Sequence, residues 1–226
     1  KLNNRINVIS NIGDSKSILL VSGTISLNSQ YIKKKLAGIN DSIKHNYRID
    51  NKWNYRMDNQ YDNFSLVVFE NYPSSKMDLD KFKELMIDIE KLDLSTIIIF
   101  GPNQDYEILK EISNLFPFHV YDKPLINQKL ITNKNYYNSY DLSNFPPNNS
   151  FFTVTSNIEN KNNIYYEDGS CAISYKEDNH MFIFYPNIGN IAYKTNEFRE
   201  DDFENFVSNL FINMYHKGLK VNLFTD

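Results

Sequence analysis

The sequence predicts an α/β fold: a doubly wound, mostly parallel sheet with a late β-hairpin and a C-terminal helix. Three apolar runs, SILLVSG at 17–23, FSLVVFENYP at 64–73 and STIIIFG at 95–101, have the length and the turn-bounded form of strands buried on both faces. A helical segment follows each run, and this spacing is typical of β-α-β units with parallel strands. The right-handed crossover of such units places helices on both faces of the sheet.

Strands and helices alternate along the first half of the chain. A weakly alternating segment at 5–10 is either an edge strand or, with the rest of residues 1–13, the tail of a preceding β domain. Asp78 is the expected N-cap of the second helix, because its carboxylate can accept from the free amides of the first turn. The expected elements are, in order, a strand at 17–23, a helix at 27–38, a strand at 45–50, a polar connection at 53–63, a strand at 64–73, a helix at 78–92, a strand at 95–101, a helix at 103–116 and a short strand at 118–121.

The second half differs in composition. Residues 122–150 are polar, and Pro146 and Pro147 prevent regular structure where they stand. Three strands are expected, at 150–156, 171–177 and 180–187, followed by an amphipathic helix at 200–218. A turn at 177–179 would join the last two strands into a hairpin. The simplest organisation is one domain over residues 1–226, with the second half completing the same sheet.

Composition and charge argue against several classes of function. Hydrophobic residues make up 41% of the 226 residues, enough for a substantial core, while the net charge of -4 argues against a nucleic-acid-binding surface. A single cysteine rules out an intrachain disulfide, and no apolar run approaches the ~20 residues of a membrane span. The sequence starts KLNNRINVIS, without an initiator Met or an apolar leader, so we expect it to be part of a longer protein.

Five segments carry a resemblance that covers nearly the whole chain in element order. They are INVISNIGDSKSILLVSGTISLNSQYIKKKL, FSLVVFENYP, STIIIFG, NFPPNN and DGSCAISYKEDNHMFIFYPNIG. Together they resemble the class I glutamine amidotransferase-like fold, in the non-catalytic form found within large bacterial membrane or envelope proteins. The resemblance implies a flavodoxin-like sheet and a structural or binding role without a cofactor. It also implies an extracytoplasmic place at the envelope, with other domains of the same longer chain or envelope proteins as partners.

The catalytic feature of that superfamily is a nucleophilic Cys on a tight strand-to-helix turn, which a later His and an acid activate. The matching turn here is FGPNQD at 100–105, which contains neither Cys nor Ser and has Pro102 and Asn103 at the nucleophile's position. The one cysteine, Cys171, lies in a later strand candidate and is interpreted as an ordinary apolar strand residue. Amidotransferase chemistry is therefore not expected.

Any ligand site is expected at the carboxyl ends of the parallel strands, where open α/β sheets bind ligands. The candidate ligand-binding residues are Ser22, Gly23, Asn71, Gly101 and Asn103. The turn at Ser22 and Gly23 has no glycine-rich phosphate-binding pattern, and a tight turn by itself requires one glycine. We therefore interpret it as the first turn of a scaffold. The rival hypothesis is a small-molecule- or sugar-binding protein or a hydrolase-type enzyme, which a bound molecule or a paired acid and histidine at this edge would favour.

Metal and serine-hydrolase chemistry find no support in the residue spacing. The histidines are dispersed, at His45, His119, His180 and His216, without the spacing of metal ligands. The G-x-S-x-G pattern of a serine nucleophile is also missing from the sequence. No metal and no catalytic residue is predicted.

Overall fold

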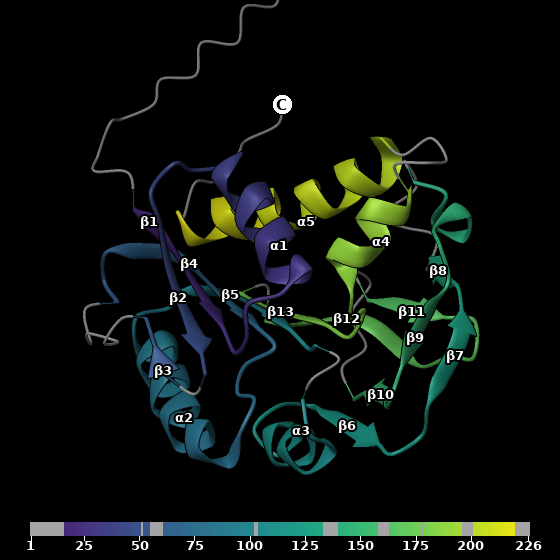
Figure 1. The fold of residues 1–226 in the computed structure, drawn as a ribbon, viewed down its shortest axis with the longest axis horizontal. Coiled ribbons are helices and arrows are strands. Elements are labelled where there is room, and N and C mark those ends of the chain that lie inside the picture. The colour runs from purple at the N-terminus through teal and green to yellow at the C-terminus, as the bar shows by residue number, and fades with distance from the viewer. Residues whose placement is uncertain are drawn as a thin grey trace, which may run out of the picture.

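The chain folds around one large mixed β-sheet with helices on both of its faces (Figure 1). This computed structural model describes residues 16–50, 52–54, 61–101, 104–132, 140–157, 163–177, 179–195 and 201–219. Within these residues the protein has five α-helices and a sheet of nine strands. The predicted α/β class is confirmed.

Five adjacent strands of the sheet run parallel, and the strands outside them run antiparallel to their neighbours. The parallel strands are, across the sheet, β2 (Ile43–Ile49), β1 (Ser17–Ser22), β4 (Phe64–Glu70), β5 (Ser95–Ile99) and β13 (His180–Ile183). The antiparallel strands are β3 (Lys52–Trp53) beside β2, and then β12 (Cys171–Lys176), β11 (Ile164–Tyr166) and β8 (Leu130–Thr132) beyond β13. The expectation of a mostly parallel sheet is therefore correct for its centre only.

The central strands are buried on both faces, which explains their continuous apolar sequences. Every residue of β4 and of β5 is buried, and so is every residue of β1 after Ser17. Successive side chains of β4 enter different clusters: Leu66 and Val68 pack on one face of the sheet, and Val67 and Phe69 pack on the other. This is the pattern of a parallel sheet covered on both sides by its crossover helices.

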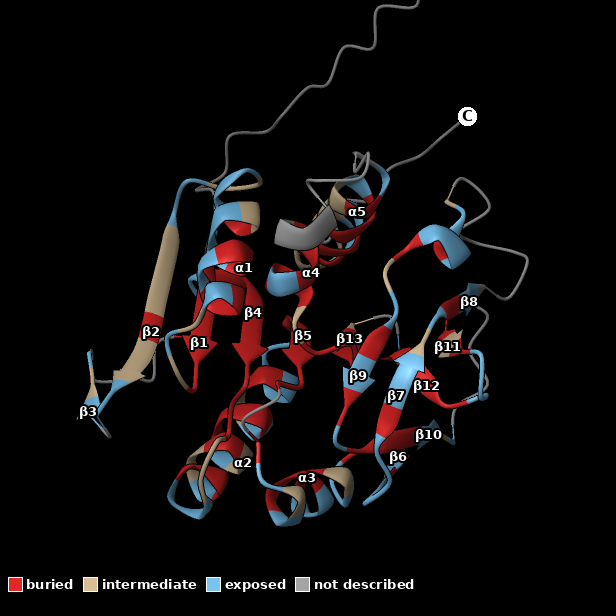
Figure 2. Cartoon of the chain, turned by 45° about the vertical axis from the view of Figure 1, so that its right-hand side comes forward, coloured by how far each residue is buried: buried red, intermediate tan, exposed pale blue. Residues whose placement is uncertain are grey.

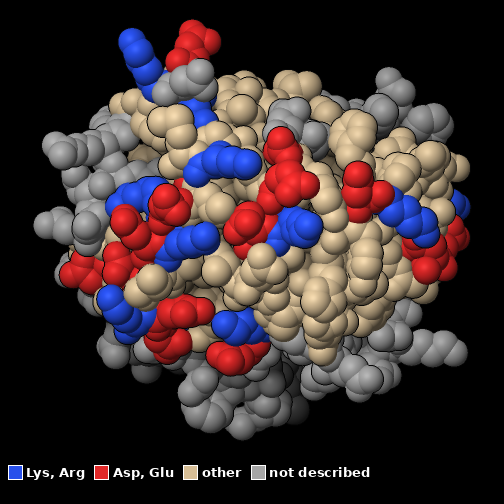
Figure 3. All heavy atoms as spheres, turned by 90° about the horizontal axis from the view of Figure 1, so that it is seen from below, with Lys and Arg blue, Asp and Glu red and all other residues tan. Residues whose placement is uncertain are grey.

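Two apolar clusters, one on each face, join the helices to the sheet (Figure 2). One face is covered by α1 (Leu27–Ala37), α4 (Ile188–Thr195) and α5 (Asp201–Gly218). The other face is covered by α2 (Lys76–Lys91) and α3 (Tyr106–Ser113). On the side of the molecule formed by α2 and α3, basic and acidic side chains are intermixed (Figure 3), as expected for solvated helix faces.

The helix starts follow local sequence signals, with one difference from expectation. A capping box begins α1: the Ser29 amide donates to the Ser26 hydroxyl at 3.1 Å, and the Ser26 amide donates to the Ser29 hydroxyl at 2.8 Å. The N-cap of α2 is Ser75, so the prediction of Asp78 at that position is wrong. Asp78 lies in the first turn, where its carboxylate interacts favourably with the helix dipole. It also forms an ion pair with Arg48 of β2.

The second half contains more regular structure than the sequence predicts. β6 (Phe118–Tyr121) pairs with β10 (Thr153–Ser156), and β7 (Leu125–Gln128) pairs with β9 (Asn148–Ser150), in two separate two-stranded sheets. A 3-10 helix, η1 (Leu142–Asn144), precedes the two prolines, which interrupt regular structure as expected. The elements β3, β7, β8, β9, β11, η1 and α4 were not predicted.

The predicted hairpin and C-terminal helix are both confirmed. β12 and β13 pair antiparallel, with Lys176 opposite His180. α5 ends at Gly218, where an added Cβ would lie 1.8 Å from the Ser65 carbonyl oxygen, so the helix end packs closely against the start of β4. The strand expected at 5–10 lies outside the described residues.

Candidate functional site

The carboxyl ends of β1, β4 and β5 meet at one edge of the sheet. The Gly23 amide donates to the Glu70 carbonyl at 3.0 Å, and the Asn71 amide donates to the Ile99 carbonyl at 2.9 Å. Four of the five predicted site residues lie in this junction: Ser22, Gly23, Asn71 and Gly101. The fifth, Asn103, lies outside the described residues.

Both glycines of the junction are required by close packing against Asn71. A Cβ on Gly23 would lie 1.9 Å from the Asn71 carbonyl oxygen, and a Cβ on Gly101 would lie 2.5 Å from the Asn71 Oδ1 atom. Asn71 itself adopts a φ of 51°, in the left-handed region that Asn tolerates better than most residues. The glycines therefore allow the strand ends to approach each other.

The predicted side chains contact neighbouring residues of the chain instead of an open surface. Ser22 is 0% exposed and Asn71 is 1% exposed. The Asn71 Nδ2 atom donates to the Thr24 hydroxyl at 3.0 Å. Gln104, also buried, accepts from the Gly101 amide and donates to the Pro73 carbonyl, both at 3.0 Å. The turn after β5 is thereby tied to the turn after β4.

Glu70, the last residue of β4, is the buried acid of this edge. Its place at the edge follows from the end of the predicted strand, but its burial does not. Its Oε1 atom accepts from Asn28 Nδ2 at 3.3 Å, across 42 positions of sequence. Burial raises the pKa of Glu70 to about 7, although the Asn28, Ser22 and Ser26 side chains oppose the increase. The carboxyl is therefore about half protonated near neutral pH. A glutamate at a strand end, before a polar turn, is expected to be solvated. Its buried partner Asn28 is 42 positions away, so no local sequence pattern indicates the contact.

Ser22 stands between Glu70 and a histidine. The Ser22 hydroxyl lies 3.0 Å from His45 Nε2, and Ser22 is the register neighbour of Glu70 in the sheet. Burial, with a smaller effect of Lys33, lowers the pKa of His45 to about 4, so its ring is neutral at neutral pH. In a catalytic triad the histidine stands between the nucleophile and the acid. Here the serine occupies the middle, and it is fully buried.

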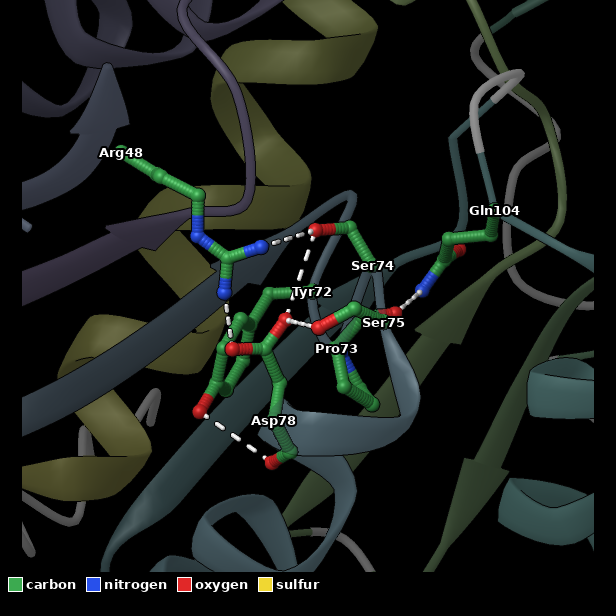
Figure 4. A network of polar contacts seen from close by, with 7 residues as sticks. All are labelled: Arg48, Tyr72, Pro73, Ser74, Ser75, Asp78 and Gln104. Atoms are coloured by element: carbon green, nitrogen blue, oxygen red, sulfur yellow. Dashed lines mark hydrogen bonds and ion pairs between the residues drawn. The ribbon is translucent and has the colours of Figure 1, made fainter. Parts of the chain in front are cut away.

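A second polar network lies beside this junction (Figure 4). Arg48 forms an ion pair with Asp78 and donates to the Ser74 hydroxyl at 3.3 Å. The Ser75 hydroxyl donates to the other Asp78 oxygen at 2.7 Å, and the Tyr72 hydroxyl donates to the Asp78 carbonyl at 3.4 Å. The guanidinium also lies 5.1 Å from the centre of the Trp53 ring. These contacts connect β2 and the turn after β4 to the start of α2.

A small surface hollow lies between α2 and α3, apart from the residues predicted to bind a ligand. Its volume is about 220 Å³. It is lined by Lys76, Leu79, Glu107, Ile108 and Glu111. The charges around it are of both signs, as on the surrounding helix faces, so its lining selects no particular charge.

Other chemically reactive groups do not assemble into a site within the described residues. Cys171 is buried in β12, and burial raises the pKa of its thiol to about 12, so it behaves as the apolar strand residue that was predicted. No group of three His, Cys, Asp or Glu side chains is arranged there to hold a metal ion. None of the described helices is long and apolar enough to cross a membrane.

Comparison with known proteins does not assign this site. Searches against protein-family models and against curated proteins find no match to the chain.

Proposed function

We propose that the chain is a non-catalytic structural or binding domain of a larger, envelope-associated bacterial protein. One observation carries the proposal: the side chains expected to line a ligand crevice are buried and bonded to neighbouring residues of the chain. Ser22 contacts His45, Asn71 contacts Thr24, and Gln104 joins Gly101 to Pro73. A scaffold requires such closed packing, whereas a binding site requires polar groups left free for the ligand.

The strand order supports an amidotransferase-like, doubly wound arrangement as the finer class. Across the parallel centre of the sheet the order is β2-β1-β4-β5-β13. Numbered by position along the chain within this group alone, that order is 2-1-3-4-5, the flavodoxin-like order. The hairpin of β12 and β13 follows the two prolines in chain order, as the resemblance implies. The envelope location rests on the resemblance to envelope-protein domains.

The residues at the position of the amidotransferase nucleophile support a non-catalytic role. The turn after β5 carries the sequence FGPNQD, without Cys or Ser. Cys171 is remote from that turn in sequence, lies within β12 and is buried with its proton on sulfur at neutral pH. The thiolate is the nucleophilic form, so this cysteine does not substitute for the missing one.

The alternative is a small-molecule- or sugar-binding protein or a hydrolase-type enzyme that uses the same edge. The contact between Ser22 and His45, next to a glutamate with a pKa of about 7, favours this alternative. Two features count against it: Ser22 is 0% exposed, and the order of the three groups differs from that of a triad.

Cell fractionation of the source bacterium tests the proposal. An antibody raised against this domain is used to blot soluble and envelope fractions, with a cytosolic enzyme as the fractionation control. We expect a band much larger than the 226-residue chain, in the envelope fraction. A soluble band of the chain's own size would contradict the proposal, and the alternative would then be pursued by ligand screening.

A further inference from the structure

The surface hollow between α2 and α3 combines an apolar floor with a charged rim. Its volume is about 220 Å³. The buried residues of its lining are Leu79 of α2 and Ile108 of α3, which are 8% and 4% exposed and form the floor. The exposed residues of its lining are Lys76, Glu107 and Glu111, which form the rim.

The two signs of charge on the rim come from different helices. Lys76 is the first residue of α2, where the partial positive charge of the helix start adds to that of the ammonium group. The N-cap residue of this helix, Ser75, makes no capping bond with its side chain. Glu107 and Glu111 are four positions apart on α3, so their side chains share one face of that helix. The rim therefore has a positive side on α2 and a negative side on α3.

These three charged side chains have no partner within the part of the chain that the structure describes. No ion pair and no side-chain hydrogen bond between described residues involves Lys76, Glu107 or Glu111. By contrast, Lys81 and Glu84 on the same helix α2 pair with each other at 3.2 Å. A binding site requires polar groups that are left free for a ligand, and the rim of the hollow provides them.

The size and the lining of the hollow together define a class of ligand. Its volume lies below the roughly 300–1,000 Å³ of sites for drug-sized molecules, so it suits a smaller one. A molecule that matches the rim carries a positive and a negative group, and one that matches the floor has an aliphatic part. An aliphatic α-amino acid has all three features.

We propose that the hollow is a binding site for a small aliphatic amino acid in its zwitterionic form. The ammonium group of the ligand binds between Glu107 and Glu111, and its carboxylate binds to Lys76. Its side chain lies on the floor of Leu79 and Ile108. None of these residues belongs to the closed carboxyl edge of the sheet, so the inference does not depend on the proposed function.

An NMR titration of the full chain with leucine tests the site. The backbone amides of Leu79 and Ile108 should shift and saturate, with a dissociation constant of about 1 mM for a ligand of so few atoms. Amides of α5, on the opposite face of the sheet, should not shift. N-acetyl-leucine lacks the ammonium group and 3-methylbutylamine lacks the carboxylate. Each should bind at least about threefold more weakly than leucine, the effect of losing one exposed charge pair.

Two variants assign the ends of the ligand. Lys76→Met should weaken leucine binding about threefold and leave 3-methylbutylamine binding unchanged, because that amine has no carboxylate to lose. Glu111→Gln should weaken leucine binding to a similar extent and leave N-acetyl-leucine binding unchanged. The matched controls are Lys81→Met and Glu84→Gln, which lie on α2 outside the lining and should bind leucine as the wild type does.

Three results would overturn the proposal. One is the absence of a saturable shift at Leu79 and Ile108 up to about 50 mM leucine. Another is equal affinity for leucine and its two analogues, which would show that the rim charges are not read. The third is an equal shift in α5, which would assign the effect to non-specific binding. If a variant does not fold, the analogue series on the wild type decides alone.

Discussion

The side chain of Asn28 lies 3.3 Å from the Glu70 carboxyl and so bonds the start of α1 to the end of β4. This contact is part of a wider arrangement in which the polar residues at the carboxyl edge of the sheet are buried and bonded to neighbouring residues of the chain. The edge that holds ligands in many α/β proteins is packed here like a core.

The buried Glu70 makes the stability of the protein depend on pH. Its pKa is raised from an ordinary 4.5 to about 7, so the folded state holds the proton more tightly than the unfolded state does. The resulting stabilisation is complete below pH 4.5 and is lost as the pH rises through 7, a change of about 3 kcal/mol at 1.36 kcal/mol per pKa unit. Urea denaturation at pH 5 and pH 8 should show this loss in wild type and not in Glu70→Gln. Parallel losses in the two proteins would refute the prediction.

Gly23→Ala should strongly destabilise the protein. The new Cβ would lie 1.9 Å from the Asn71 carbonyl oxygen, a backbone atom that cannot move without displacing the end of β4. We expect a loss of about 3 kcal/mol, or failure to fold. Gly38→Ala is the matched control, because its Cβ would lie 3.3 Å from the Lys35 carbonyl oxygen and Gly38 has an α-helical φ of -71°. Thermal unfolding should shift little for the control, and equal shifts for the two variants would contradict the packing described.

The ion pair of Arg48 and Asp78 should behave as a buried pair. Its side chains are only 13% and 6% exposed, so removal of one partner leaves the other charge poorly solvated. Arg48→Met and Asp78→Leu should each cost about 3 kcal/mol in denaturant titrations, and the double variant should cost less than their sum.

The exposed pair of Lys81 and Glu84 is the control for that cycle, since its side chains are 38% and 68% exposed. Lys81→Ala should change the unfolding free energy by less than about 0.5 kcal/mol. Additive losses in the Arg48 and Asp78 cycle would show that the two side chains act independently.

Cys171 should be unreactive in the folded protein. Burial raises the pKa of its thiol to about 12, and its sulfur lies 3.4 Å from the Ile173 carbonyl oxygen. At pH 8, a thiol-specific disulfide reagent should modify the protein only after urea unfolds it. Modification of the native protein at the rate of a free cysteine would contradict the buried position of β12.

The central strands could be predicted because their signal is local. β1, β4 and β5 are buried on both faces, so each leaves an unbroken apolar run, and the meeting of Gly23, Asn71 and Gly101 follows from the parallel direction of these strands. The N-cap of α2 is hard to place from the sequence because Ser74, Ser75 and Asp78, within five positions, all suit a helix start.

The remaining elements depend on partners that are distant in sequence. β7, β8, β9 and β11 are three or four residues long and are specified by pairing with other strands, which no short window of sequence reveals. α4 covers only two turns, and the sequence prediction, which extends the preceding strand to residue 187, assigns no element to residues 188–195. The buried environment of Glu70 includes a hydrogen bond from Asn28, and only folding brings these two residues together.

Solvent paramagnetic relaxation, with a soluble gadolinium chelate, tests most directly whether the carboxyl edge of the sheet is closed. The side-chain amide of Asn71 and the backbone amides of Gly23 and Gly101 are compared with the side-chain amide of Asn190, which is exposed. The structure predicts that the three edge groups relax as slowly as the buried amides of β4, while Asn190 relaxes strongly. Relaxation of the Asn71 side chain as strong as that of Asn190 would contradict the closed edge and would favour an open ligand site.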